Sequence, residues 1–251
     1  LLHDTWLLFS WSIKATLRSP VWALIGLFQP LCYLFLFGPL LQPLSHLAGF
    51  PAGGAQTVFV PGVMVMMSIF NTAFVGFNLV GELRAGFIER LRITPLSRLA
   101  LPLGRVLRDI VLLLIQSLLL VAIALPMGAH VDLVGLVFLC GLLALLGLCL
   151  ASCSYGLALT FKDENALSSV LNTFNLPLFL LSGITLPLTL APPVLRTLGN
   201  FNPLAYAVDT ARALFLGDIT NATVVKGFVI TGVLALAALF WAFRAFQRAT
   251  T

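Results

Sequence analysis

The chain has 251 residues, of which 60% are hydrophobic and only 9% are charged, whereas soluble domains carry about 25% charged residues. No Asp, Glu, Lys or Arg occurs in the 63 positions from Ser19 to Gly81, far more than the roughly 20 apolar residues of one membrane-spanning helix. The composition excludes an ordinary soluble domain and predicts an all-α membrane protein with several spans. The net charge of +5 comes from basic residues beside apolar runs, which is typical of membrane topology rather than of nucleic-acid binding.

The first predicted element is an amphipathic helix over residues 1–18, which we expect to lie in the membrane interface. Spans follow at 21–41 and 57–80, separated by a Pro- and Gly-rich loop over 42–56. The most charged region of the chain, residues 82–109, comes next and is expected in water or at the interface. Its first part, residues 82–95, reads as a short charged helix that ends at Pro95.

Four further spans are predicted at 109–125, 133–161, 166–184 and 224–243. Between the last two, residues 185–217 contain several prolines and predict short helices rather than a span. The whole chain is thus interpreted as one transmembrane domain with six spans.

The distribution of positive charge predicts the orientation of these spans. Six spans place both termini on one side, and assigning that side to the cytoplasm leaves only Arg196, Arg212 and Lys226 of the 14 Lys and Arg residues outside. Under the positive-inside rule both termini are therefore cytoplasmic.

The sequence contains no motif for chemistry or for nucleotide binding. His3, His46 and His130 lie in separate segments, so we expect no catalytic residue and no metal site. No Gly-Lys dipeptide occurs, so the chain lacks a P-loop, and any ATP must be bound by another subunit.

Neutral polar residues inside the spans are candidates for a substrate path. No charged residue falls in the middle of a span, where ion-coupled transporters usually carry one. Asn71 and Asn78 are seven positions apart and are expected on one helix face, and the fifth span contains Asn172 and Asn175. These side chains either line a substrate path or form hydrogen bonds between helices.

The charged segment 82–95 is the strongest functional signal. Phe87 and Leu91 fall on one face of the predicted helix, with Arg84, Glu89 and Arg90 around them. Such a helix either docks in a groove of a cytoplasmic partner or rests on lipid headgroups.

Two runs carry a resemblance to a known family. The run Glu82, Gly86, Glu89, Leu91, Thr94 and Pro95 resembles the E-x-x-x-G-x-x-E-x-L-x-x-T-P loop of ABC type-2 exporter permeases. The runs Ser182 to Pro187, Pro192 to Arg196, Asn202 to Tyr206 and Asp209 to Arg212 resemble the S-G-x-x-x-P, P-x-x-L-R, N-P-L-x-Y and D-x-x-R sequence of the same family. The resemblance covers nearly the whole chain.

The resemblance implies a role for each region. Residues 1–18 would be an elbow helix, residues 185–217 would form short re-entrant helices in the outer leaflet, and residues 82–95 would be the coupling helix that contacts an ATPase. The implied ATPase contacts are Glu82, Arg84, Gly86, Phe87, Glu89, Arg90, Leu91, Arg92, Thr94 and Pro95. Pro203, Tyr206, Asp209 and Arg212 would lie at an outer gate, although an Asp209–Arg212 pair at i, i+3 could equally stabilise a surface helix.

The predicted function is the permease subunit of an ATP-binding-cassette exporter in the bacterial cytoplasmic (inner) membrane. It would act as a dimer with a second permease subunit, in contact with membrane lipids, and would move a drug, an antibiotic or a lipid-like molecule out of the cytoplasm or inner leaflet. Two separate P-loop subunits would hold ATP and Mg, and the chain itself would need no cofactor and bind no nucleic acid. An ATP-independent transporter or channel, a membrane scaffold and an intramembrane enzyme are the alternatives. Substrate identity and the choice between a homodimer and a heterodimer stay open.

Overall fold

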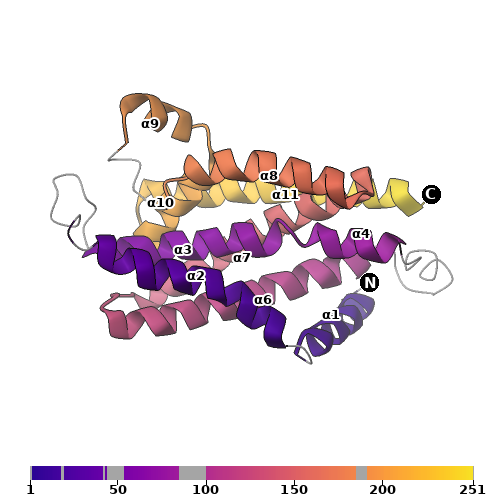
Figure 1. Cartoon of the computed structure of the whole chain (residues 1–251), viewed down its shortest axis with the longest axis horizontal. Helices are drawn as coiled ribbons and strands as arrows, with labels where there is room; N and C mark the ends of the chain where they lie inside the picture. The colour runs from indigo at the N-terminus through magenta and orange to yellow at the C-terminus, as the bar shows by residue number, and fades with distance from the viewer. Residues whose placement is uncertain are drawn as a thin grey trace.

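The computed structural model describes residues 2–17, 20–41, 43, 54–84, 100–184 and 191–250, and this part of the chain is helical with no β-strand. The long helices run along one common direction (Figure 1). Both termini lie at the end of the bundle where α4 finishes, and α9 and α10 lie toward the opposite end. The all-α prediction is confirmed.

The first helix, α1 (Leu2–Leu17), packs on the start of α6 (Ala100–Ala124). Gly104 makes this contact possible, because a Cβ there would meet the backbone of Thr5 and Phe9 at 3.2 and 3.3 Å. Trp6 is exposed. The expected interfacial role of this helix stays a prediction.

The next helices are α2 (Pro20–Leu41), α3 (Gly54–Thr72) and α4 (Gly76–Arg84). The sequence predicts a single helix over 57–80, but a turn at residues 73–75 separates α3 from α4. The Ser154 hydroxyl fills this break, since it accepts a hydrogen bond from the Gly76 amide at 2.9 Å and donates one to the Ala73 carbonyl at 2.5 Å. The break has no proline or glycine at its centre, which is why the sequence pattern did not reveal it.

Helix α6 begins well before the predicted start at residue 109. Pro102 lies in its first turn, where proline is tolerated, and no further proline follows until Pro126. A 3-10 turn, η2 (Leu125–Met127), and Gly128 at φ 93° lead to α7 (Leu133–Phe161). Asp132 caps α7 by accepting a hydrogen bond from the Gly135 amide at 2.7 Å.

The chain then forms α8 (Glu164–Leu180), α9 (Pro193–Gly199), α10 (Pro203–Phe215) and α11 (Ala222–Thr250). Asp163 caps α8, and Asn202 caps α10 by accepting a hydrogen bond from the Leu204 amide at 3.0 Å. Helix α8 stops at Leu180, four residues before the predicted end of its span.

Helix α7 is central to the packing, because α3, α6, α10 and α11 all contact it. Helix α10 is wedged between α3, α7 and α11, and its Leu214 and Phe215 side chains are completely buried. Helix α10 is therefore packed inside the bundle, whereas one of the two expectations for Asp209 and Arg212 was a helix on the surface.

Four helical segments of the described chain are long and apolar enough to cross a membrane, namely Gln56–Glu82, Leu103–Met127, Leu133–Phe161 and Ala222–Arg248. In α2 the apolar helix over Gly26–Leu40 is shorter, and α8 has 17 residues. The count of six spans stays a prediction, with α2 and α8 as the remaining two.

Candidate functional site

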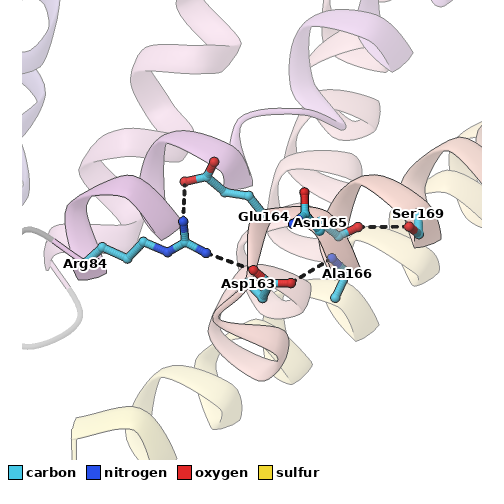
Figure 2. Close-up of polar contacts among 6 residues, drawn as sticks. All are labelled: Arg84, Asp163, Glu164, Asn165, Ala166 and Ser169. Carbon is cyan, nitrogen blue, oxygen red and sulfur yellow. Dashed lines mark hydrogen bonds and ion pairs between the residues drawn. The ribbon is translucent and has the colours of Figure 1, made fainter.

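Charged residues from three helices meet at the end of the bundle where α4 finishes. The Arg84 guanidinium at the end of α4 lies 2.8 Å from the Asp163 carboxylate and 3.5 Å from that of Glu164, both at the start of α8 (Figure 2). Two residues earlier on α4, Glu82 pairs with Arg105 of α6. The last turn of α4 is therefore tied to two neighbouring helices.

The short link between α7 and α8 positions the acidic partners of Arg84. Lys162 ends α7 in the left-handed conformation, with φ 53°, so the chain turns at once into α8. Asp163 then uses one carboxylate oxygen for Arg84 and the other to accept a hydrogen bond from the Ala166 amide at 3.1 Å (Figure 2). Two acidic residues at a helix N-terminus also interact favourably with the helix dipole.

A second polar cluster lies deeper in the bundle, on α6 and α7. The Tyr155 hydroxyl donates a hydrogen bond of 2.7 Å to Asp109, whose other oxygen accepts from Arg108 at 2.6 Å. Asp109 is only 6% exposed. The sequence places this region in water or at the interface, but the early start of α6 buries Arg105 and Asp109 between helices.

The turn at residues 73–75 places the two asparagines of the second predicted span on different helices, Asn71 on α3 and Asn78 on α4. The Asn71 amide donates a 2.6 Å hydrogen bond to Gln116 of α6. Asn78 lies on α4 and is exposed. Asn71 therefore takes part in a hydrogen bond between α3 and α6.

Asn71 also borders a cavity of about 210 Å³ between α2 and α3. Gly26, Gln29, Met66 and Phe70 complete most of its wall. A Cβ at position 26 would approach the Gln116 amide nitrogen to 3.0 Å, so glycine lets α2 pack against the polar pair. Of the predicted path residues, Asn71 lines this cavity.

The two asparagines of α8 differ in exposure. Asn172 is exposed and donates a hydrogen bond to Ser168 at 3.1 Å, and its neighbours Thr173 and Phe174 are exposed as well. Asn175 is half-buried, and its amide nitrogen has no hydrogen-bond partner within the described residues. The hydrogen bonds of Asn71 and Asn172 thus go to different partners, Gln116 and Ser168.

At the opposite end of the bundle, Arg212 of α10 joins three parts of the chain. It lies 3.8 Å from Asp209, the expected partner, but it donates shorter hydrogen bonds to the carbonyls of Gly183, at 2.8 Å, and Val58, at 3.1 Å. Burial lowers its pKa to about 10, so the guanidinium remains charged at neutral pH. Pro203 begins α10, and the Tyr206 hydroxyl donates to the Asn200 carbonyl at 2.9 Å.

Most predicted ATPase contacts lie outside the described residues. These are Gly86, Phe87, Glu89, Arg90, Leu91, Arg92, Thr94 and Pro95, whereas Glu82 and Arg84 are described. Arg105, Asp163 and Glu164 are not among the site residues predicted from the sequence. The Lys-Asp-Glu run between two apolar helices is an N-cap signal that points to Asp163 and Glu164, whereas no comparable signal marks Arg105.

Within the described residues, no group of three or more His, Cys, Asp or Glu side chains could hold a metal ion. The candidate site is a set of ion pairs and hydrogen bonds between helices.

Comparison with known proteins identifies the family. A family model described as "ABC-2 type transporter" matches residues 3–216. The chain is 28% identical over 200 residues to the "Putative transport permease ycf38" of Cyanophora paradoxa, covering 79% of this chain and 69% of that protein. It is 29% identical over 203 residues to the protein of the same name from Pyropia yezoensis, with the same coverage of both chains. The resemblance inferred from the sequence motifs is thus confirmed, and the chain belongs to the ABC-2 type transporter family.

Proposed function

We propose that this chain is the membrane subunit of an ATP-driven exporter for amphipathic or hydrophobic molecules, such as a drug, an antibiotic or a lipid-like compound. The family is one of transport permeases, which normally work with an ATP-binding subunit. In the proposed complex, two copies of that subunit hold ATP and Mg and drive two permease subunits. Export rather than import rests on the resemblance of the Glu82 to Pro95 loop and the Ser182 to Arg212 runs to exporter permeases.

The observation that carries the proposal is the attachment of the predicted coupling segment to the bundle. Glu82 and Arg84 belong both to residues 82–95 and to the last turn of α4, and their partners lie on α6 and α8. A push on residues 82–95 would therefore reach α6 through the Glu82–Arg105 pair and α8 through Arg84. An anchor that only rests on lipid headgroups would not need partners on two other helices.

The outward-facing polar residues of α8 support a second permease subunit. Asn172 and Thr173 are exposed in the middle of α8, beside the exposed Phe174. Both side chains already donate a hydrogen bond within α8, to Ser168 at 3.1 Å and to the Ser169 carbonyl at 2.7 Å, and a helix interface or a substrate path would offer further partners for their remaining hydrogen-bonding capacity. We therefore propose that α8 contacts the second permease subunit. From the distribution of Lys and Arg, we further propose that both chain termini lie on the cytoplasmic side of a bacterial inner membrane.

The test is reconstitution of the chain in lipid vesicles with a candidate ATP-binding subunit, measuring both ATP hydrolysis and movement of a fluorescent amphipathic dye. We expect both activities only when the two proteins are present together. A double variant, Glu89→Ala with Arg92→Ala, should still assemble but should move less dye per ATP hydrolysed. Lys226→Ala, an exposed charge at the start of α11, is the matched control and should behave as wild type.

If no P-loop protein binds the chain and the double variant is indistinguishable from wild type, the proposal fails. An ATP-independent channel would instead move dye without the partner, and a scaffold would show neither activity.

A further inference from the structure

A second cavity, of about 380 Å³, lies where α6, α7 and α11 meet. Val106 of α6, Ser152 and Tyr155 of α7, and Leu239 and Phe240 of α11 form much of its wall. Pockets that bind small molecules measure about 300 to 1,000 Å³ and are mostly apolar with a few polar groups. This cavity has the size and composition of a small ligand site, and it shares no wall residue with the cavity beside Asn71.

Its polar wall residues, Ser152 and Tyr155, lie three positions apart on one face of α7. The Tyr155 hydroxyl is already engaged with Asp109. Ser152 is 1% exposed, and its hydroxyl has no hydrogen-bond partner among the described residues. On the same helix, the Ser154 hydroxyl has two partners. The cavity wall therefore includes a buried serine whose hydrogen-bonding capacity is unused.

The position of Ser152 along α7 shows whether water could satisfy its hydroxyl. Helix α7 has 29 residues, so at 1.5 Å per residue it is about 43 Å long, against roughly 30 Å for the hydrocarbon of a bilayer. Ser152 comes nine residues before the end of the helix at Phe161, or about 14 Å from it. This places Ser152 inside the hydrocarbon, where water is not available to satisfy a hydroxyl.

The cavity is reached from the lipid side. Leu236 and Phe240, both wall residues on α11, are 68% and 58% exposed. An apolar approach thus exists past Leu236, whereas the Arg244 guanidinium lies over the Phe240 ring, 4.5 Å from its centroid. A plain hydrocarbon chain would fill the space but would leave Ser152 without a partner.

We propose that this cavity binds a largely apolar molecule that carries one hydroxyl or carbonyl group, with Ser152 as its hydrogen-bond partner. The ligand enters laterally from the bilayer. If the ligand is a transported substrate, this cavity would be its first binding site, and that part of the proposal rests on the proposed exporter function. The binding of the ligand does not depend on that function.

The test uses a matched pair of photoreactive probes in phosphatidylcholine vesicles that contain the chain alone. One probe is a long-chain alcohol that carries a diazirine and an alkyne tag, and the other is the same molecule without the hydroxyl. We expect the alcohol to label peptides of α6, α7 or α11, and Ser152→Ala to reduce that labelling about fivefold, as the loss of one hydrogen bond predicts. Labelling by the hydroxyl-free probe should not change in this variant.

Two further variants make the result specific. Ser117→Ala removes another buried hydroxyl without a partner among the described residues, from α6 and outside this cavity, and should leave labelling by both probes unchanged. Ala242→Leu adds bulk to the cavity wall and should reduce labelling by both probes, with size-exclusion chromatography in detergent to check folding.

Equal labelling by the two probes, no effect of Ser152→Ala, or labelling confined to other helices would overturn the proposal, and the cavity would then be an ordinary groove for acyl chains. No ATP-binding subunit is present in this assay, so a failure here is distinguishable from a failure of the exporter function.

Discussion

Replacement of Arg212 should show that this side chain holds α10 against its neighbours by binding backbone carbonyls. Its guanidinium is buried and donates to the carbonyls of Gly183 and Val58 at 2.8 and 3.1 Å. Hydrogen bonds from a charged group contribute about 1.5 to 3 kcal/mol each, so two of them represent roughly 3 to 6 kcal/mol. Part of this is offset because the variant no longer buries a charge.

We therefore expect Arg212→Met to destabilise the protein by about 3 kcal/mol. For a chain of this size that corresponds to a fall in Tm of roughly 6 to 12 °C. Arg212→Lys should lose about half as much, because an ammonium group keeps the charge but cannot reach two carbonyls in the planar geometry of a guanidinium. The assay is thermal unfolding in detergent, followed by the loss of the monodisperse peak.

Asp209→Asn is the matched control. The carboxylate of Asp209 is 52% exposed and lies 3.8 Å from the guanidinium, so the pair should contribute less than about 1 kcal/mol. If Asp209→Asn lowered Tm as much as Arg212→Met, the ion pair and not the carbonyl contacts would hold α10, and the reasoning would be refuted.

Three further predictions concern helix contacts. Gly135→Ala should destabilise the protein by at least about 1 to 3 kcal/mol in the same assay, because a Cβ there would overlap the Leu214 carbonyl oxygen of α10. Gly141→Ala is the control and should be neutral or slightly stabilising, because the space around Gly141 is open. Equal effects of the two substitutions would contradict the close approach of α7 to α10. Ser154→Ala should lower Tm by an amount equivalent to about 2 kcal/mol, since it leaves the Gly76 amide and the Ala73 carbonyl without their partner. Ser152→Ala should change Tm little, because the Ser152 hydroxyl has no partner among the described residues. A larger fall in Tm for Ser152→Ala than for Ser154→Ala would show that other contacts stabilise the break after α3. Arg84→Ala should reduce the dye moved per ATP while changing stability by less than about 1 kcal/mol, because the Arg84–Asp163 pair is half exposed. An unchanged amount of dye per ATP would mean that the pair does not transmit movement.

The polar side chains show which site features can be read from a sequence. The Lys-Asp-Glu run after α7 contains its own signal, because an Asp followed by an acidic residue is typical of a helix N-terminus, and the structure has Asp163 as the cap of α8. That Arg84, 79 positions earlier, pairs with this cap depends on how α4 and α8 pack, and no local pattern encodes it. The same holds for the Asn71 and Gln116 pair on α3 and α6.

What the sequence determined by itself follows from local and compositional physics. A stretch of 63 residues without an ionisable Asp, Glu, Lys or Arg side chain can only be accommodated in a membrane, prolines and glycines mark the places where helices end, and family motifs depend only on residue order. Helix α7, over Leu133–Phe161, coincides with the span expected from hydrophobicity, because both of its ends carry local signals: the Asp132 cap and the polar link at Lys162.

Only the tertiary structure decided what those local signals do not contain. Nothing in residues 73–75 breaks a helix; the break exists where Ser154 of α7 offers the backbone alternative hydrogen bonds, and it separates Asn71 from Asn78. Arg212 was expected to pair with its neighbour Asp209, but its shortest contacts are carbonyls from α3 and from the segment after α8. In both cases the deciding partner is distant in the chain, because a buried polar group must be satisfied by whichever donor or acceptor the packing of the helices brings next to it.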